Sequence, residues 1–314
     1  MLKSTRDAYG EALLRLGELE PLVVVLDADL SSSTRSSRFA ARFPERYFEM
    51  GIAEQNLYGV AAGLAAGGKI PFASTFAVFA TERAFNQIRQ SIAYPKLNVK
   101  IVSSHSGFTA SGDGGSHQTL IDVGLMRCLP NMTVVVPADA VQAGEAVLAA
   151  ARYQGPLYLR LGKSEVPILF EPGSPFRIGE AVPMRSGRDV TVLVLGTMLG
   201  PALAAAEELA ERGVSAELIS IHTIKPLDRE AILASARRTG AVVTVEEHSL
   251  IGGLASAVAE LLAAHDPVPM GFVGVNDVFG ESGSEADLYR AHGLTAQGIS
   301  EKVLELLNRK RGKA

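Results

Sequence analysis

One acidic residue stands at the start of a predicted helix, directly after a short strand. Residues 47–50 are predicted to form a strand that stops at Gly51, and apolar residues recur with helical spacing over 57–64. A helix that begins near Ala53 places Glu54 in its first turn. Acidic residues at helix starts commonly only complement the helix dipole, so this position alone favours a structural role for Glu54. Residues farther along the chain change that interpretation.

Other polar and aromatic residues follow the remaining apolar runs, where strands are predicted to end. Because the carboxyl ends of parallel strands meet at one edge of a sheet, we expect these side chains to lie together. They are Asp29 and Ser33, Phe76 and Phe79, His105, Asp113 and His117, and Arg160. Acids, imidazoles and a guanidinium at one rim can bind a polar substrate and move protons. Taken singly, either histidine could be a surface-loop residue, but the group as a whole predicts a functional site.

The elements that would carry this site form two series of alternating strands and helices. The strands are continuous apolar runs, which is typical of a parallel sheet covered on both faces. In the first series we predict strands at 22–26, 47–50, 70–74, 99–103, 132–136 and 157–160, helices at 3–20, at 35–43, from 53, and at 79–93, 119–128 and 139–153, and a glycine-rich loop over 105–118. In the second we predict strands at 189–195, 215–221, 241–245 and 270–275, and helices at 200–212, 228–239, 252–264 and 295–308.

The predicted fold class is therefore α/β, with two doubly wound domains whose sheets are mostly parallel. A chain of 314 residues is long enough for two separate cores. We place the first domain at 1–170 and the second at 189–314. Residues 171–188 are rich in Gly, Pro and Arg and are predicted to be a linker with one edge hairpin.

The composition excludes several classes of function. With 47% hydrophobic and 20% charged residues it is ordinary for a globular protein, and the net charge of −4 gives no support to nucleic-acid binding. No apolar run reaches the roughly 18 residues that a membrane span needs. The single cysteine, Cys128, excludes an internal disulfide and is predicted to be a buried structural thiol. We expect a cytoplasmic protein without nucleic-acid or membrane partners.

Two common ligand motifs are missing from the sequence. No G-x-G-x-x-G fingerprint follows the strands that end at Leu26 and Leu195, so no dinucleotide site is predicted. His105 and His117 have no third ligand at a convincing spacing, so a zinc site is not expected.

Four stretches and two spacings carry a specific resemblance. They are Asp27-Ala28-Asp29-Leu30, Gly51-Ile52-Ala53-Glu54, Ser74-Thr75-Phe76 and Asp113-Gly114-Gly115-Ser116-His117-Gln118, with the spacing of Arg6, Asp29 and Ser33 and that of His105, Asp113 and His117. Over nearly its whole length the chain resembles the C-terminal half of a transketolase, as found in organisms that split the enzyme into two polypeptides. The resemblance implies a pyrimidine-binding domain followed by a transketolase C-terminal domain. Single-chain transketolases usually have Arg and His beside the catalytic Glu, where this chain has Ala53 and Gln55.

The resemblance implies thiamine diphosphate as the cofactor, which reacts through C2 of its thiazolium ring. Glu54 is implied to be the carboxyl that hydrogen-bonds N1′ of the aminopyrimidine and so promotes loss of the C2 proton. Phe76 and Phe79 would form an aromatic wall on the pyrimidine, with Asp29 and Leu30 as further cofactor contacts. Without the resemblance, the two phenylalanines could also be ordinary core aromatics.

The same resemblance implies the contacts to the substrate. His105 and His117 would hydrogen-bond the donor sugar near its carbonyl and first hydroxyls and take part in catalysis. Asp113 would recognise the hydroxyl next to the reacting carbon. The phosphate at the mouth of the site would be held by Arg6, Ser33 and Arg160. The motif Glu246-Glu247-His248 in the second domain is predicted to have a structural or interface role.

The diphosphate and its Mg²⁺ are expected to bind to another polypeptide. Asp113 lies in a Gly-Asp-Gly tripeptide, which opens the metal–diphosphate motif of thiamine-diphosphate enzymes, but the paired Asn of that motif is missing around 137–140. We therefore predict no metal site in this chain and an N-terminal transketolase subunit that supplies the Mg²⁺ ligands. The family implies an α₂β₂ heterotetramer that acts on sugar phosphates. The small residues Gly59, Ala62 and Gly63 are expected at its interface.

Three other functions stay open on the sequence alone. Half of a deoxyxylulose-phosphate synthase and the β subunit of a 2-oxo acid dehydrogenase share the fold, although the latter usually has a different loop from the one between Asp113 and His117. From a different class, the chain could be a non-catalytic subunit that stabilises an assembly. A non-catalytic subunit would have little need for Glu54 together with the aromatic wall of Phe76 and Phe79.

Overall fold

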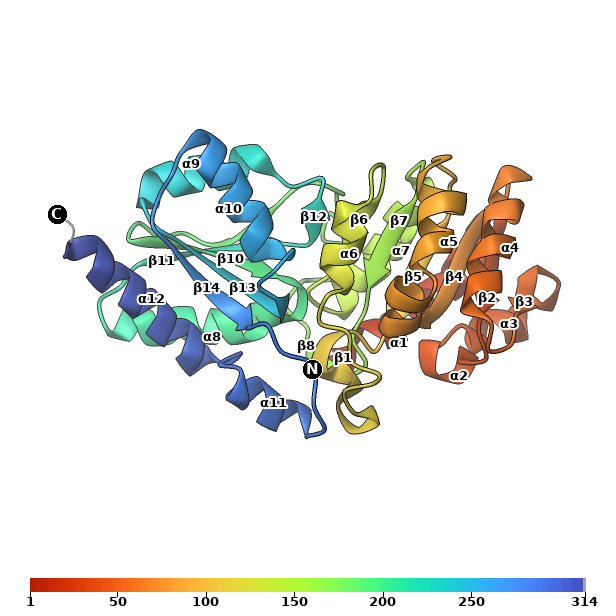
Figure 1. The fold of residues 1–314 in the computed structure, drawn as a ribbon, viewed down its shortest axis with the longest axis horizontal. Coiled ribbons are helices and arrows are strands. Elements are labelled where there is room, and N and C mark those ends of the chain that lie inside the picture. The colour runs from red at the N-terminus through yellow and green to blue at the C-terminus, as the bar shows by residue number, and fades with distance from the viewer. Residues whose placement is uncertain (313–314) are drawn as a thin grey trace.

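The computed structural model describes residues 1–312, which form two α/β domains lying side by side (Figure 1). The sheets are mostly parallel, so the predicted fold class is confirmed. Within these residues, no helix combines the length and the apolar character needed to cross a membrane.

The first domain is built on a seven-stranded sheet with the order β12-β6-β7-β5-β4-β2-β3. The strands are β2 (Val23–Asp27), β3 (Tyr47–Glu49), β4 (Ile70–Phe76), β5 (Lys100–Ser104), β6 (Thr133–Val135), β7 (Leu157–Arg160) and β12 (Thr223–Lys225). Strands β6, β7, β5, β4, β2 and β3 pair in parallel, while β12 runs antiparallel to β6. The loops that follow the parallel strands therefore gather at one edge of the sheet.

Helices cover both faces of this sheet. They are α1 (Thr5–Leu19), α2 (Ser31–Thr34), α3 (Ser37–Arg42), α4 (Glu54–Ala66), α5 (Phe85–Gln87), α6 (Asp122–Cys128) and α7 (Ala140–Arg152). On one face, Leu13 of α1 and Val147 of α7 are buried in a core with Val25. On the other, Leu57 of α4 and Met126 of α6 are buried in a second core. Because neighbouring residues of β2 contribute to different cores, this strand is apolar from Val23 to Leu26, as the sequence pattern indicated.

The second domain has a five-stranded sheet with the order β14-β13-β10-β11-β9. Its strands are β9 (Val182–Arg185), β10 (Val190–Leu195), β11 (Ala216–Ile221), β13 (Val242–Ser249) and β14 (Met270–Val275), and its helices are α8 (Leu199–Glu211), α9 (Arg229–Thr239), α10 (Leu254–His265), α11 (Glu285–Ala291) and α12 (Ala296–Arg311). The strands pair in parallel apart from β9, which is antiparallel to β11.

The two domains are joined by shared structure as well as by the chain. By sequence β12 belongs to the second half, but it pairs with β6 at the edge of the first sheet. One apolar core continues from Leu57 and Val136 of the first domain to Ile219 and Val258 of the second. A short antiparallel ribbon of β1 (Leu2–Ser4) and β8 (Glu165–Pro167) ties the first residues of the chain to the segment after β7.

Two predicted helices are interrupted in the structure. The helix expected at 35–43 is shortened to α3, because Arg35 has a left-handed φ of +71° that separates α3 from the preceding turn α2. The helix expected at 79–93 consists of a π-helical turn at Phe79–Arg83, the short α5 and a second π-helical turn at Ile88–Ala93.

Two other predictions were wrong. Cys128 is exposed, because it lies on the outer side of α6 while its neighbour Leu129 is buried. The expected edge hairpin of the linker is instead one strand, β9, which extends the second sheet.

Candidate functional site

Glu54 is the first residue of α4, and its side chain is only 3% exposed. No side chain caps the helix at Ala53, so an acidic group in the first turn complements its unpaired N–H groups. The Oε1 atom of Glu54 accepts a hydrogen bond of 3.0 Å from Arg83 Nη1. The same guanidinium lies over the ring of Phe79, with Cζ 4.6 Å from the ring centroid. One flat cation therefore contacts both the carboxylate and the aromatic ring.

A row of rings connects this carboxylate to the loop after β5. Phe79 stacks on Phe76 with 5.8 Å between centroids, and Phe76 stacks on His105 at 3.8 Å. Phe79 also meets the imidazole of His117 edge-on at 5.5 Å. Such contacts fix the relative orientation of rings. The structure thus brings the two predicted phenylalanines and the two predicted histidines into one cluster.

A cavity of about 470 Å³ opens beside this row of rings. Its lining consists of Arg6, Ser32, Ser33, Arg35, Phe76, His105, Asp113, His117 and Lys163. These residues come from the first turn of α1 and from segments at the ends of β2, β4, β5 and β7. Most of the substrate contacts expected from the sequence therefore share one cavity.

His105 is held in a strained and buried position. It directly follows β5 with a left-handed φ of +56°, a conformation that tends to occur at functional sites. Its Nε2 lies 3.3 Å from Arg6 Nη1 and its Nδ1 lies 2.9 Å from Ser104 Oγ. Because a guanidinium only donates, Nε2 is the acceptor and the ring proton is assigned to Nδ1. Burial, followed by the charge of Arg6, lowers the pKa of His105 to about 3, so the imidazole is neutral near pH 7.

The neutral state of His105 predicts how stability depends on pH. The pKa of His105 is lowered on folding, so below the usual histidine pKa of about 6.5 the unfolded chain binds a proton that the folded chain does not. Asn also tolerates the left-handed φ, so His105→Asn is a suitable comparison. The amount by which wild type is more stable than this variant should therefore shrink as pH falls from about 6.5 to 4.5. The expected slope is at most about 1.4 kcal/mol per pH unit. Urea unfolding at several pH values measures this slope. A stability difference that does not change with pH would show that His105 binds a proton in the folded chain as it does in the unfolded chain.

Around His105 the cavity is crowded with positive charge. Burial, and then the nearby Arg35, lower the pKa of Arg6, and within residues 1–312 the buried Nε of Arg6 has no hydrogen-bond partner. Arg35 is paired with Asp7 at 2.7 Å, and Lys163 Nζ lies 3.5 Å from Asp113 Oδ2. An anionic group of a ligand would relieve this crowding and supply the missing acceptors.

Arg160 is not part of this cavity, and its predicted contact with a phosphate is wrong. The side chain is 5% exposed, and its Nε donates to Asp122 Oδ2 at 2.8 Å while Nη1 lies 3.6 Å from Glu247 Oε2. As the last residue of β7 it points into the covered side of the sheet. Lys163, three residues later in the loop that leaves the strand, lines the cavity instead. In the sequence, the only sign of this role is a second cation, Lys163, just beyond the strand end.

Asp29 and Leu30 lie on the turn after β2 and do not line the cavity. Asp29 is exposed with a φ of +61°, and its N–H donates to Glu49 Oε1 at 2.8 Å. The N–H of Leu30 donates to Asp27 Oδ1 at 2.7 Å. The first bond ties the turn after β2 to β3, and the second closes that turn onto the end of β2. A cofactor contact by Asp29 or Leu30 stays a prediction. Among residues 1–312, no three His, Cys, Asp or Glu side chains gather in a way that could hold a metal ion.

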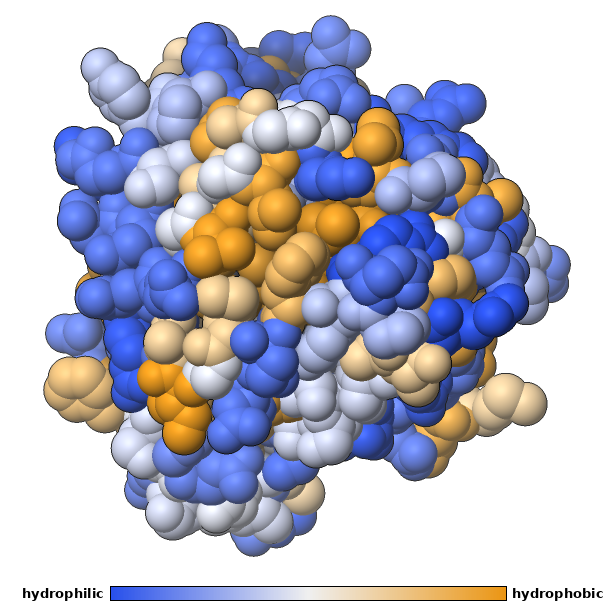
Figure 2. Space-filling model, turned by 90° about the vertical axis from the view of Figure 1, so that its right-hand side faces the viewer, coloured by the Kyte–Doolittle hydropathy of each residue, from blue (hydrophilic) through white to orange (hydrophobic). Residues whose placement is uncertain are grey.

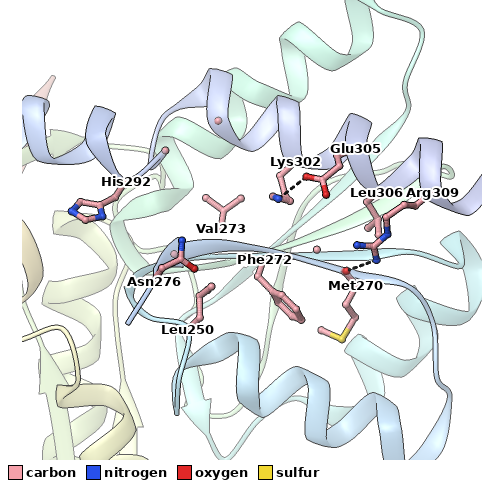
Figure 3. A pocket seen from close by; sticks show the side chains of 14 residues that line it. Leu250, Met270, Phe272, Val273, Asn276, His292, Lys302, Glu305, Leu306 and Arg309 are labelled. Atoms are coloured by element: carbon pink, nitrogen blue, oxygen red, sulfur yellow. Dashed lines mark hydrogen bonds and ion pairs between the residues drawn. The ribbon is translucent and has the colours of Figure 1, made fainter. Parts of the chain in front are cut away.

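A second cavity of about 330 Å³ lies in the second domain between β14 and α12 (Figure 3). Lys302 in its wall is paired with Glu305 at 2.6 Å, and Arg309 donates to the Met270 carbonyl at 3.4 Å. These charged groups already bind one another or the backbone, and none of the predicted site residues lines this cavity. The first cavity is therefore the candidate active site.

Comparison with known proteins finds two family matches along the chain. Residues 2–168 match the family described as "Transketolase, pyrimidine binding domain", and residues 179–299 match "Transketolase, C-terminal domain". A Methanocaldococcus jannaschii protein, provisionally named as a transketolase C-terminal section, is 45% identical over 306 residues, covering 96% of each chain. A 6-deoxy-6-sulfo-D-fructose transketolase subunit from a Clostridium species is 45% identical over 305 residues, covering 97% of this chain and 95% of that protein.

A solved structure is also similar over nearly the whole length. It is described as a split gene transketolase in an inactive β4 tetramer. It is 55% identical to this chain, with a TM-score of 0.92 and coverage of 97% of this chain and 98% of that one.

Proposed function

The chain belongs to the transketolase family, and on this basis we propose that it is the C-terminal subunit of a split, thiamine-diphosphate-dependent transketolase. Together with an N-terminal subunit it would transfer a two-carbon ketol unit between sugar phosphates in the cytoplasm. The observation that carries this proposal is one continuous set of contacts. It runs from Glu54 through Phe79 to the imidazoles and cations of the cavity.

The geometry around Glu54 fits the pyrimidine end of the cofactor. The buried Glu54 carboxylate lies close to the aromatic pair Phe76 and Phe79, so a planar ring with a donor at its edge can pair with Oε2 while Arg83 stays on Oε1. An aminopyrimidine ring has the same shape and, protonated at N1′, the same polarity. When bound, thiamine diphosphate supplies a thiazolium carbon that becomes nucleophilic and takes up the ketol unit.

Glu54 is proposed to hold and release a proton at N1′. Its Oε1 is engaged by Arg83, and within residues 1–312 no hydrogen bond reaches its Oε2. That oxygen is therefore available to a ligand. Because the carboxylate is 3% exposed, water competes little for the proton it shares. Arg83 also places a cation beside this acid, although the neighbouring positions Ala53 and Gln55 lack the charged side chains of single-chain relatives.

The residues of the cavity are proposed to bind the sugar phosphate. Neutral His105 presents an acceptor at Nε2, and His117 and Asp113 provide further polar groups for the carbonyl and hydroxyls of the donor. Arg6 and Lys163 would hold the phosphate, because both line the crowded cationic end.

Replacing Lys163 by glutamine tests the phosphate assignment. The variant keeps a polar but shorter side chain and removes the charge, so the KM for phosphorylated ketoses should rise about tenfold, the value of one charge-assisted hydrogen bond. The KM for an unphosphorylated ketose donor should stay within about twofold. Steady-state kinetics on the reconstituted enzyme measure both, with Lys302→Gln in the second domain as a control for loss of a surface charge. An equal increase for both donors would show that Lys163 does not contact phosphate.

The outer surface of the first domain supports a partner subunit. Figure 2 shows apolar side chains gathered on the end of the molecule where Figure 1 places α4 and β3. Gly59 and Gly63 of α4 face open space, Val60 and Leu64 are only partly buried, and Ile52 is 76% exposed. We propose that the N-terminal subunit, which would also supply the Mg²⁺ ligands, covers this face. Two such pairs related by a twofold axis would give an α₂β₂ heterotetramer.

A donor and acceptor panel run on the reconstituted pair tests the function. Ketol transfer from a ketose phosphate to an aldose phosphate is the expected result. A 6-sulfonated ketose belongs in the panel, since one relative is named for such a sugar and the cationic end of the cavity suits any terminal anion. Turnover of pyruvate with no transfer between sugars would favour the synthase or dehydrogenase alternatives instead.

A further inference from the structure

The second domain contacts the loop that carries part of the candidate site through Glu247. This residue lies near the end of β13 and is 3% exposed. Its Oε1 accepts a hydrogen bond of 2.6 Å from the N–H of Phe108 in the first domain. Phe108 stands in the helical turn Gly107–Asp113, which begins two residues after His105. The N–H groups that start such a turn have no partner within it, so Glu247 completes the turn from outside.

A buried ion pair holds Glu247 in this place. Arg160 Nη2 donates to the Glu247 carbonyl at 3.0 Å, and Nη1 lies 3.6 Å from Glu247 Oε2. The Nε of Arg160 donates to Asp122 Oδ2, which also accepts from the Tyr158 hydroxyl at 2.7 Å. The guanidinium predicted to bind phosphate therefore links the end of β7 to the second domain. Removing one member of such a buried group leaves the others without partners, which is costly.

The contact between Glu247 and the turn is too close for a side chain at Gly107. Gly107 has a φ of +59°, and a Cβ there would collide with the Glu247 carboxylate and lie 2.9 Å from Arg160 Nη2. Phe108, the next residue, also stacks on His292, which follows α11, with 4.9 Å between ring centroids. The start of the turn is thus enclosed by the second domain on two sides.

We propose that Glu247 is a positioning residue, through which the second domain sets the geometry of the substrate loop, residues 105–117. The proposal rests on the proposed function, because this loop carries His105, Asp113 and His117. Without the Glu247 carboxylate, the buried Phe108 N–H has no acceptor and Arg160 loses one of its two acidic partners. The loop should then sample positions in which the three side chains no longer converge on the sugar.

Glu246 offers a matched control on the same strand. It is also fully buried, but its two oxygens accept from the N–H groups of Leu254 and Ala255 at the start of α10, inside the second domain. Substitution of Glu246 therefore removes a buried carboxylate without touching the substrate loop.

Burial raises the pKa of Glu247 to about 7, against the opposing charge of Arg160, so a neutral amide of the same shape should fit in its place.

The test compares Glu247→Ala, Glu247→Gln and Glu246→Ala in the full chain and in the reconstituted enzyme. We expect both alanine variants to lower the unfolding temperature, while only Glu247→Ala raises the KM for the sugar donor about tenfold and speeds hydrogen exchange in peptides covering 105–117. Glu247→Gln should restore most of the wild-type KM, because its amide oxygen still accepts from Phe108. Gly107→Ala, which keeps every charge and pushes the turn away from Glu247, should reproduce the effect on KM.

Two results would overturn the inference. One is equal exchange over 105–117 in Glu247→Ala and Glu246→Ala, which is measured on this chain alone and does not depend on activity. The other is a KM in Glu247→Ala that matches wild type. Failure of the proposed function looks different, since the wild-type pair would then transfer no ketol unit to any sugar.

Discussion

Replacing Glu54 by alanine is expected to lower turnover of the reconstituted enzyme by a factor of about 10² to 10⁴, the usual cost of losing a positioned proton-transferring group. The KM for sugars should change little, since the cavity that binds them lies at the other end of the row of rings. The chain should still fold, because the side chain left unpaired, Arg83, is 51% exposed and can be solvated. The direct measurement is exchange of the cofactor C2 proton for deuterium, followed by NMR.

The control for this prediction is Glu45→Ala, which removes an exposed carboxylate that precedes β3. It should leave both turnover and C2 exchange unchanged. If C2 exchange in Glu54→Ala were as fast as in wild type, another group would be the acid at N1′.

Much of the fold follows from local sequence patterns. Continuous apolar runs such as 22–26 predict buried parallel strands, since both faces of each strand need cover, and the spacing after Gly51 predicts the helix that begins at Glu54. What the patterns could not give is the pairing of distant segments. Strand β12 has three residues and lies in the second half of the sequence, and nothing local indicates that it joins the first sheet.

The site shows the same limit at the level of single side chains. The order of strand ends was enough to gather His105, Asp113, His117 and Phe76 around one cavity. It was not enough to decide which of two nearby cations faces that cavity. Arg160 is paired with Asp122, from a helix almost forty residues earlier, and with Glu247 from the other domain. Lys163 is paired with neither of them and lies near Asp113 instead.

Arg83 was missed for a related reason. It stands four residues after Phe79, so a helix over 79–93 places both side chains on one face. Nothing in that local spacing indicates that the guanidinium also reaches Glu54, which lies in a different helix. The roles of Glu54, Asp29 and Leu30 toward the cofactor remain predictions.

The second large effect concerns the chain by itself, which should be inactive and bind thiamine diphosphate weakly. The cavity contains cations suited to a sugar phosphate, but the sequence around 137–140 lacks the Asn that would complete a metal–diphosphate motif. Mg²⁺ binds a diphosphate through a few well-placed oxygen ligands, and the diphosphate itself needs several donors. Losing two or three charge-assisted contacts weakens binding by about 4 kcal/mol or more, which is about a thousandfold.

This prediction agrees with the exposed apolar face at Ile52, Gly59 and Gly63, which lies on the same helix and loop as Glu54. A partner seated there would close over the carboxylate and the Phe79 ring. The β4 tetramer of the solved relative is described as inactive, as expected for a subunit without its partner. Activity should therefore appear on mixing and reach a plateau at one N-terminal subunit per chain.

The most direct test of the split-enzyme account is calorimetric titration of thiamine diphosphate in the presence of Mg²⁺. It is run first on this chain and then on its equimolar mixture with the N-terminal subunit, with ketol transfer assayed in each sample. The account predicts little or no heat and no transfer for the chain alone, and saturable binding with transfer for the mixture. Micromolar binding together with ketol transfer by this polypeptide alone would contradict it.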